Sequence, residues 1–183
     1  MLIKIKNITA EGLTVHFEES AKGFPVLLEM AESGECDFFS PVKTRAILHK
    51  AGELIEVEGI VETEVRLTCS RCLKKFRAPL TDRFSFTYTR KLPDSLEKPN
   101  TTEIELRAED MGLILFEGDT IDFREAIQQQ VVMMFPQRPL CNDLCKGLCP
   151  QCGADLNEGN CGCRRSTFNS KFAALKDLKI ENK

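Results

Sequence analysis

Cysteine is the residue type that offers the clearest chemistry in this sequence of 183 residues. Six of its nine cysteines lie within residues 141–163, and two others, Cys69 and Cys72, form a Cys-x-x-Cys pair. Such residues can ligate a metal ion, carry out thiol redox chemistry or form disulfides. Their spacing and their neighbours distinguish these three chemistries.

The C-terminal cysteines include two pairs with the spacing of zinc ligands. Cys149 and Cys152 flank Pro-Gln and are followed by Gly153, which tolerates the unusual backbone dihedral angles of such a turn. Cys161 and Cys163 lie two residues apart, so on extended chain both side chains point to one face. Zinc prefers four ligands in a tetrahedron, and these four cysteines predict one such site.

Two further pairs lack a partner pair nearby in the sequence. They are Cys69 with Cys72 and Cys141 with Cys145, and joining them across the fold makes a second site of four cysteines. This partition leaves only Cys36 outside a site. Other partitions of the C-terminal cysteines stay open, including one site with two spare thiols, so we expect one or two Zn²⁺ ions per chain.

Four protein ligands leave no coordination position for a substrate, which is typical of a structural zinc site. Zinc would then stabilise a segment that has few apolar residues of its own. The alternative is a thiol-redox or zinc-responsive regulator that uses Cys69 and Cys72. A redox pair of this kind belongs at a strand-to-helix junction, where the helix N-terminus lowers a thiol pKa, whereas strand-like sequence flanks this pair on both sides.

The location expected from the sequence also favours metal binding over disulfides. The first residues, MLIKIKNITAEG, alternate in polarity and lack the apolar run of a signal peptide. No stretch reaches the roughly 18 apolar residues of a membrane helix. We therefore expect a cytosolic protein without a membrane partner, in a reducing compartment that disfavours a disulfide scaffold.

The elements that position the cysteines are predicted to be mainly β-strands. Apolar and charged residues alternate with a period of two over Ile55–Cys69, which indicates a half-buried strand. Gly59 within it suggests a bulge or a bend. A second alternation covers residues 76–88, so the two runs predict a hairpin whose tip carries Cys69 and Cys72.

Shorter elements are predicted on both sides of this hairpin. We expect strands at residues 13–18, 103–107 and 113–116, and a loop over residues 91–103. Near the C-terminus, apolar residues at helical spacing over 168–179 predict a short amphipathic helix.

One main helix is predicted at about residues 122–135. Asp122 and Glu125 match a capping box at its start. Apolar residues follow at helical spacing over Phe123–Met134, and Pro136 ends the pattern.

Together these elements predict an α+β fold. An antiparallel, β-rich domain with the one main helix is expected over residues 1–140. A cysteine-rich, zinc-ribbon-like module follows over residues 141–164, and a short C-terminal amphipathic helix or tail over residues 165–183.

No catalytic constellation is recognisable in the sequence. The two histidines, His16 and His49, lie in or beside predicted strands with no nucleophile motif near them. Phosphate-binding glycine loops and metalloprotease motifs are also missing from the sequence. We therefore expect a protein that is not an enzyme and has no small-molecule substrate.

Charge is distributed unevenly along the chain. Residues 65–91 carry eight basic side chains against Asp82 alone, a net charge of +7, while residues 103–125 carry a net charge of −6. A basic hairpin with a metal-anchored tip is suited to contact phosphates, and a solvated or protein-binding face is the alternative. Aromatic residues such as Phe84 share the apolar parity of the hairpin and are predicted to lie in the core rather than to stack on bases. The predicted nucleic-acid contacts are Arg71, Lys74, Lys75 and Arg77.

The sequence resembles the YceD-type family of large ribosomal RNA subunit accumulation proteins. The resemblance runs from about Val57 to the C-terminus, and four stretches carry it: LTCSRCLKKF, IDFREAIQQQVVMMFPQRPLC, CKGLCPQCGADLNEGNCGC and FAALKDLK. The resemblance implies a role in bacterial or chloroplast ribosome biogenesis, affecting the accumulation of 23S ribosomal RNA, with no established enzymatic activity.

Metal positions and partners follow from the same resemblance. The metal positions that it implies are Cys69, Cys72, Cys141, Cys145, Cys149, Cys152, Cys161 and Cys163. The expected partner is ribosomal RNA or a large-subunit ribosomal protein, met in the bacterial cytoplasm. No oligomeric state is predicted.

Overall fold

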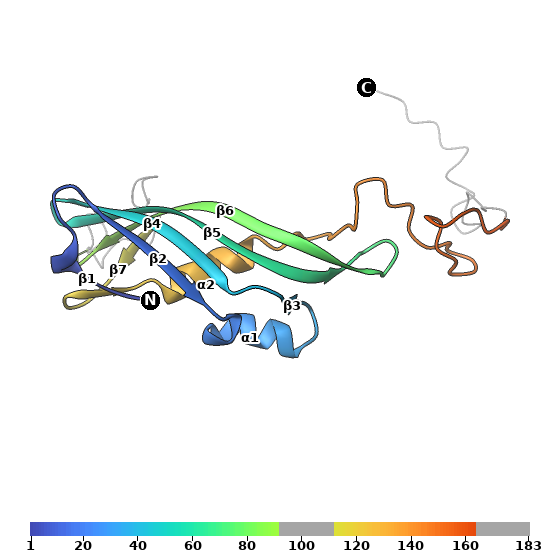
Figure 1. Ribbon diagram of the computed structural model, residues 1–183, viewed down its shortest axis with the longest axis horizontal. Helices are drawn as coiled ribbons and strands as arrows, with labels where there is room; N and C mark the ends of the chain where they lie inside the picture. Colours follow the sequence, from blue (N-terminus) through green and yellow to red (C-terminus); the bar gives the residue numbers. More distant parts are fainter. Residues whose placement is uncertain (92–111, 164–183) are drawn as a thin grey trace, which may run out of the picture.

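A long antiparallel hairpin dominates the fold and carries the cysteine-rich segment at its far end (Figure 1). The computed structural model describes residues 1–91 and 112–163. The strands are β1 (Leu2–Lys4), β2 (Leu13–Glu19), β3 (Asp37–Phe38), β4 (Val42–Ala51), β5 (Leu54–Thr68), β6 (Lys75–Thr89), β7 (Leu113–Leu115) and β8 (Thr120–Asp122). The helices are α1 (Pro25–Glu32) and α2 (Arg124–Met133), with short 3₁₀ turns at Ile5–Asn7 and Ala21–Gly23. The predicted α+β class is confirmed.

The main sheet has the strand order β2-β4-β5-β6-β7, with β3 pairing on β5. All its pairings are antiparallel except β6 with β7, which is parallel. A separate antiparallel pair joins β1 to β8. In Figure 1 the two helices and β1 lie on the same side of the main sheet, so this side holds the core.

The predicted hairpin is confirmed, and it determines the shape of the molecule. Strands β5 and β6 pair over their full lengths, from Leu54 opposite Thr89 to Thr68 opposite Lys75. Side chains on the core face of β5 are buried while most of their neighbours are exposed or half-buried, as the alternation requires. The tip-side half of the hairpin extends past the main core toward the cysteines (Figure 1).

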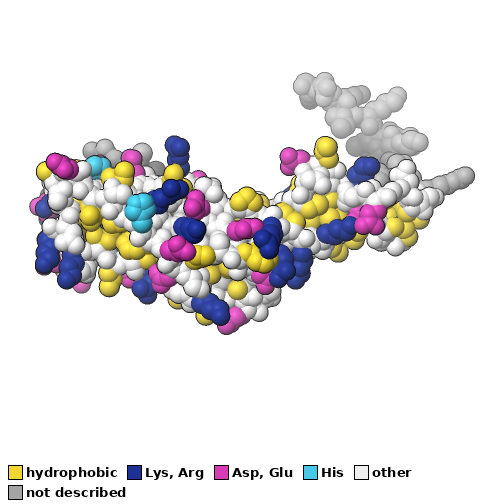
Figure 2. Space-filling model, viewed as in Figure 1, with side chains coloured by type: hydrophobic (Ala, Val, Ile, Leu, Met, Phe, Trp, Pro, Cys, Tyr) yellow, Lys and Arg dark blue, Asp and Glu magenta, His cyan; other side chains and the backbone are white. Residues whose placement is uncertain are grey.

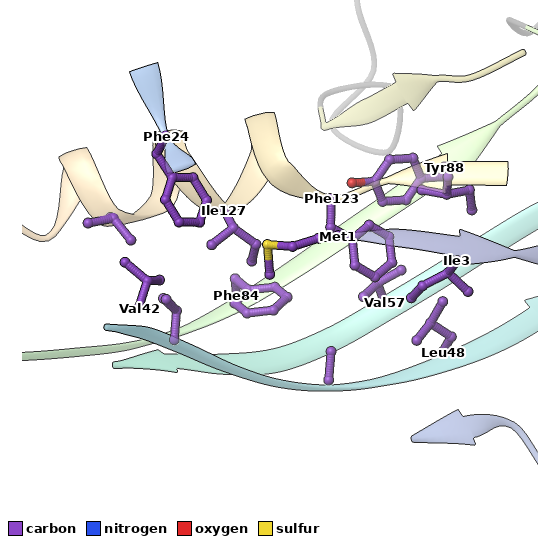
Figure 3. Close-up of a cluster of buried hydrophobic side chains, with 14 of the residues drawn as sticks. Met1, Ile3, Phe24, Val42, Leu48, Val57, Phe84, Tyr88, Phe123 and Ile127 are labelled. Atoms are coloured by element: carbon purple, nitrogen blue, oxygen red, sulfur yellow. The ribbon is translucent and has the colours of Figure 1, made fainter. Parts of the chain in front are cut away.

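The main core lies between the sheet, α2 and the β1–β8 pair. Figure 3 shows Phe123, the N-cap of α2, and Ile127 of α2 facing Val57 and Phe84 of the hairpin, with Met1 between them. Burial of these side chains removes apolar surface from water and holds the base of the hairpin. The aromatic residues of β6 therefore belong to the core, as their parity predicts.

Gly59 is explained by close packing rather than by a bulge. The register runs through it without interruption, with Ala46 opposite on β4 and Phe84 opposite on β6. A Cβ atom at Gly59 would lie 2.4 Å from the Arg45 carbonyl oxygen and 2.6 Å from Cζ of Phe84. The predicted bulge was wrong, because the register is continuous and the glycine makes room for the ring of Phe84.

A smaller apolar cluster extends the core along the hairpin. Val65, Leu67 and Leu80 pack there with Cys36, the cysteine outside the predicted sites. Burial, together with the nearby charges of Glu35 and Asp37, raises the pKa of the Cys36 thiol to about 11. Cys36 is therefore a buried apolar contact rather than a reactive thiol.

The prediction of a single main helix was incomplete, because α1 is a second one. It is only eight residues long, begins at Pro25, and its side chain Leu27 is fully buried in the core. The predicted start of α2 was also wrong. Asp122 belongs to strand β8, the N-cap is Phe123, and the Asp122 carboxylate accepts a hydrogen bond from the Arg124 backbone N–H instead of forming a capping box.

Two predicted elements, the strand at 103–107 and the helix at 168–179, lie outside the described residues. Within the described ranges, no helix is long and apolar enough to cross a membrane.

Candidate metal centres

The tip of the hairpin is a tight turn that turns two sulfur atoms toward one point. The backbone N–H of Leu73 donates to the Cys69 carbonyl at 2.9 Å, and the Cys69 N–H donates to the Lys74 carbonyl at 2.9 Å. These bonds close a turn in which Leu73 adopts a φ of 60°. The Ser70 N–H donates to the Pro139 carbonyl at 2.8 Å, which brings the chain that follows α2 to the tip.

The first cysteine group joins the hairpin tip to this returning chain. Cys69, Cys72, Cys141 and Cys145 have sulfur atoms that all lie within 4.8 Å of one another. The Sγ–Sγ distances are 3.8 Å for Cys69 with Cys145 and 3.7 Å for Cys72 with Cys141. A tetrahedron with Zn–S bonds of about 2.3 Å has edges of about 3.8 Å. The sulfur atoms are thus spaced for a shared cation, and too widely for disulfides, whose S–S bond is about 2.05 Å.

Arg71 fastens the returning chain to the tip. Its guanidinium donates to the Cys145 carbonyl at 2.8 Å, and its own carbonyl accepts from the Leu148 N–H at 3.1 Å. Gly147 passes so close that a Cβ atom there would lie 2.9 Å from the Arg71 carbonyl oxygen. Arg71, one of the four residues predicted to contact nucleic acid, therefore has a structural role within the chain.

The second cysteine group is local in sequence and repeats the geometry of the tip. Cys149, Cys152, Cys161 and Cys163 have sulfur atoms within 4.8 Å of one another. The Gly153 N–H donates to the Cys149 carbonyl at 2.9 Å, and the Cys149 N–H donates to the Ala154 carbonyl at 2.8 Å. These two bonds match those of the hairpin tip one for one.

Backbone N–H groups stabilise one thiolate in each group. Burial raises the pKa of Cys69, but the N–H groups of Cys72, Cys141 and Arg71 outweigh it and lower this pKa to about 6. The N–H groups of Cys152 and Gln151 likewise lower the pKa of Cys149 to about 6. Thiolates are the form that binds a metal, so each group has an anionic sulfur near neutral pH.

In each group another sulfur atom resists ionisation while its neighbours are only other thiols: Cys141 in the first group and Cys163 in the second. Burial and hydrogen bonds to Cys145 raise the pKa of Cys141 to about 12. Hydrogen bonds with Cys152 and Cys161 raise the pKa of Cys163 to about 12. A divalent cation reverses this effect, because it deprotonates coordinating thiols outright. Four sulfur donors with these spacings are compatible with zinc.

Three side chains of the second loop that the sequence did not reveal as important, Asp155, Asn157 and Glu158, connect the two groups. Lys74 makes ion pairs with Asp155 at 2.8 Å and with Glu158 at 2.6 Å. These pairs raise the pKa of Lys74 and lower the pKa of Asp155. The Asn157 amide donates to the Cys145 sulfur at 3.5 Å and accepts from the Lys146 N–H at 2.8 Å. The loop of the second group is therefore attached to the first group.

Of the four predicted nucleic-acid contacts, three have partners inside the chain. Besides Arg71 and Lys74, Arg77 lies 3.7 Å from Glu64 and over the ring of Phe39. The Lys75 side chain is exposed and makes no hydrogen bond or ion pair with another part of the described chain. The sequence did not reveal the partners of Lys74, because Asp155 and Glu158 approach the hairpin only once the chain has folded.

Replacing Lys74 with methionine is expected to loosen the second group while leaving the sheet intact. The change keeps most of the aliphatic side chain but removes both ion pairs with the second loop. Amide hydrogen exchange should become faster over residues 153–159 and stay unchanged over β4 and β5. The matched control is Lys75→Met, which removes an equal charge that has no such partner. Equal exchange in both variants would show that the ion pairs do not hold the loop.

Comparison with known proteins agrees with the family resemblance found in the sequence. Residues 57–179 match the family described as "Large ribosomal RNA subunit accumulation protein YceD". A protein of Arabidopsis thaliana named "Large ribosomal RNA subunit accumulation protein YCED homolog 1, chloroplastic" is 23% identical over 160 residues, which are 76% of this chain and 49% of that protein. An uncharacterized protein of Mycobacterium bovis is 30% identical over 135 residues, which are 72% of this chain and 58% of that protein.

A Zea mays protein with the same name as the Arabidopsis thaliana protein is 27% identical over 131 residues, covering 60% of this chain and 44% of that protein. The chain thus spans about half the length of the curated relatives it matches. No solved structure gives a significant match.

Proposed function

Since the chain belongs to the YceD family of large ribosomal RNA subunit accumulation proteins, we propose that it is a non-enzymatic, zinc-stabilised factor that supports accumulation of 23S ribosomal RNA. It would act in the bacterial cytoplasm during assembly of the large ribosomal subunit, by binding ribosomal RNA or an assembling ribosomal protein. The family match carries the ribosomal part of this proposal. The two cysteine groups carry the zinc part.

The proposed role of zinc is structural. Each group offers four sulfur donors, so a zinc ion in it would have a complete tetrahedron without a position for substrate. The first group holds residues 141–145 against the hairpin, and the second folds a loop that has few buried apolar side chains. Zinc would supply the folding free energy that this segment cannot obtain from an apolar core.

The proposal that the protein is not an enzyme has support from the position of its histidines. His16 and His49 lie on β2 and β4, within the main sheet rather than at the cysteine groups.

The alternative of a redox regulator has less support. The side chains of Cys69 and Cys72 are 0% and 4% exposed, whereas a redox-active thiol must be reached by its oxidant or partner thiol. Slow alkylation of these two cysteines in the native protein, becoming fast only after a chelator is added, would agree with the structural role.

Depletion of the protein from its host is expected to lower the ratio of 23S to 16S ribosomal RNA, because unfinished large subunits are degraded. The ratio should be measured by quantitative RNA electrophoresis in depleted cells and in depleted cells that carry the full chain on a plasmid. Restoration of the ratio by the plasmid is the control for specificity. A ratio that stays unchanged after complete depletion would contradict the proposed function.

A further inference from the structure

The two Cys-x-x-Cys turns, at Cys69–Cys72 and Cys149–Cys152, have the same backbone geometry but differ in one residue type. Both turns close with the same pair of backbone hydrogen bonds, from the residue after the second cysteine and from the first cysteine. That residue is Gly153 in one turn, with a φ of 73°, and Leu73 in the other, with a φ of 60°. The backbone task at this position is therefore the same in both turns.

Glycine suits this task and leucine does not. A φ in the left-handed region brings the Cβ atom of an L-residue close to its own backbone, and glycine escapes that cost. The fold gains little in return from the Leu73 side chain, which is 63% exposed. A strained residue that the fold itself does not require points to a role outside the fold.

A second exposed leucine lies beside the same cysteine group. Leu144, directly before Cys145, is 87% exposed. By contrast, Leu140 and Leu148 pack against this group. Leu73 and Leu144 are thus two exposed leucines, each next in the sequence to a cysteine of the first group.

The charges around the tip indicate what kind of partner these leucines suit. Lys74 and Arg77 are paired with carboxylates, and Arg71 donates to backbone carbonyls, so three of the four basic side chains predicted to contact nucleic acid already have partners within the described chain. On the face shown in Figure 2, basic and acidic side chains are also interspersed. RNA is bound mainly through phosphate charge and stacking on aromatic or arginine planes, whereas aliphatic side chains anchor in apolar pockets of proteins.

We propose that Leu73, assisted by Leu144, is the anchor by which this protein docks into an apolar pocket on a protein component of the assembling large subunit. The inference rests on the proposed function and narrows its partner from RNA or protein to protein. In this arrangement the hairpin tip, held by the first cysteine group, exposes Leu73 to the partner. Leucine occupies this left-handed position, which glycine would suit better, because its side chain makes the contact.

Leu73→Gly separates this role from folding, because glycine relieves the left-handed strain. The melting temperature of Leu73→Gly is expected to equal that of the wild type or to exceed it slightly. Glycine removes the backbone strain, but it also gives the unfolded chain more conformational entropy to lose on folding, which offsets part of the gain. Leu73→Asn provides a second test, because asparagine also tolerates this conformation but is polar. Leu73→Met keeps an apolar side chain and should retain binding. Leu115→Ser, which changes an exposed leucine on β7 at the opposite end of β6, is the matched control.

Binding should be measured with two probes: immature large-subunit particles isolated from the host, and the RNA extracted from those same particles. Leu73→Gly and Leu73→Asn are expected to weaken binding to the particles by roughly 10- to 100-fold, as loss of a buried interface anchor does. Binding to the extracted RNA should be the same for all variants. A photo-crosslinker placed at position 73 should give an adduct that is destroyed by protease and resists ribonuclease.

Unchanged particle binding in both Leu73→Gly and Leu73→Asn would overturn the inference, as would a weakening that appears equally on extracted RNA or an adduct destroyed by ribonuclease. Absence of particle binding by the wild type would overturn it too. The depletion experiment is independent of these measurements. A normal 23S to 16S ratio after depletion counts against the proposed function, whereas full complementation by Leu73→Gly in a strain with a depressed ratio counts against the anchor alone.

Discussion

Replacing Cys145 with serine is expected to lower the zinc content by one ion per chain, from two to one where each cysteine group binds zinc as proposed. Cys145 supplies one of the four sulfur atoms of the first group, and a serine hydroxyl is a poor substitute for a soft thiolate ligand. The affinity of this site should fall by more than the roughly 10- to 100-fold that loss of an outer hydrogen-bond partner costs a metal site. Elemental analysis of the purified variant measures the stoichiometry.

The same substitution should release the returning chain from the hairpin tip. Limited proteolysis is expected to cut faster within residues 136–146, while the far-ultraviolet circular dichroism of the sheet stays close to that of the wild type. The matched control is Cys36→Ala, which removes a cysteine that is also buried but lies outside both groups. It should keep two zinc ions. A Cys145→Ser protein that still holds two zinc ions would exclude this residue as a ligand.

Gly59→Ala is expected to destabilise the main sheet by about 3 kcal/mol, the upper part of the range for overpacking a core. The added methyl group would lie 2.4 Å from a backbone oxygen of β4 and 2.6 Å from the Phe84 ring, and a backbone oxygen inside a sheet cannot move aside cheaply. A loss of this size lowers the melting temperature of a chain of this length by roughly 6–12 °C. Differential scanning calorimetry or thermal circular dichroism measures it.

Gly23→Ala is the control for this prediction. Its methyl group would approach the carboxylate end of Glu19, which is a flexible side chain that can rotate away. Its effect on the melting temperature should therefore be clearly smaller than that of Gly59→Ala. Equal melting temperatures for Gly59→Ala and the wild type would show that the hairpin can shift to admit a side chain at this point.

The hairpin was predictable because its alternation is long and regular. Ile55–Cys69 offered enough positions of each parity to exclude a helix, and its core-facing side chains are buried as expected. The main helix was predictable from apolar spacing, but its first residue was not. Asp122 is drawn into β8 by pairing with Leu2, which lies at the other end of the sequence.

Elements whose sequence signal is short or mixed were missed. Helix α1 has only eight residues, although Pro25 at its start and Gly34 just beyond its end were usable signals. Strand β4 alternates in burial, yet it places Thr44 inside and Ile47 outside, which blurs the contrast between its faces. Tertiary context decides such cases.

The cysteine pairs were predictable from spacing, but the side chains that support them were not. Sequence patterns favoured phosphate contacts for Arg71 and Lys74, because a basic run at a hairpin tip is typical of nucleic-acid binding. Their partners come from residues that lie 74 and 84 positions later in the chain. The net charge of residues 65–91 therefore overestimated how many of their basic side chains remain unpaired after folding.

The two cysteine groups differ in when they can form as the chain is made. The second spans residues 149–163, so it can close as soon as that short piece is available. The first joins residues that are 69 and 76 positions apart, Cys72 with Cys141 and Cys69 with Cys145. Closing so large a loop costs entropy that the finished hairpin and sheet must first offset. We therefore expect metal capture in two stages, a rapid local one and a later one that reports that the whole hairpin has reached its correct register.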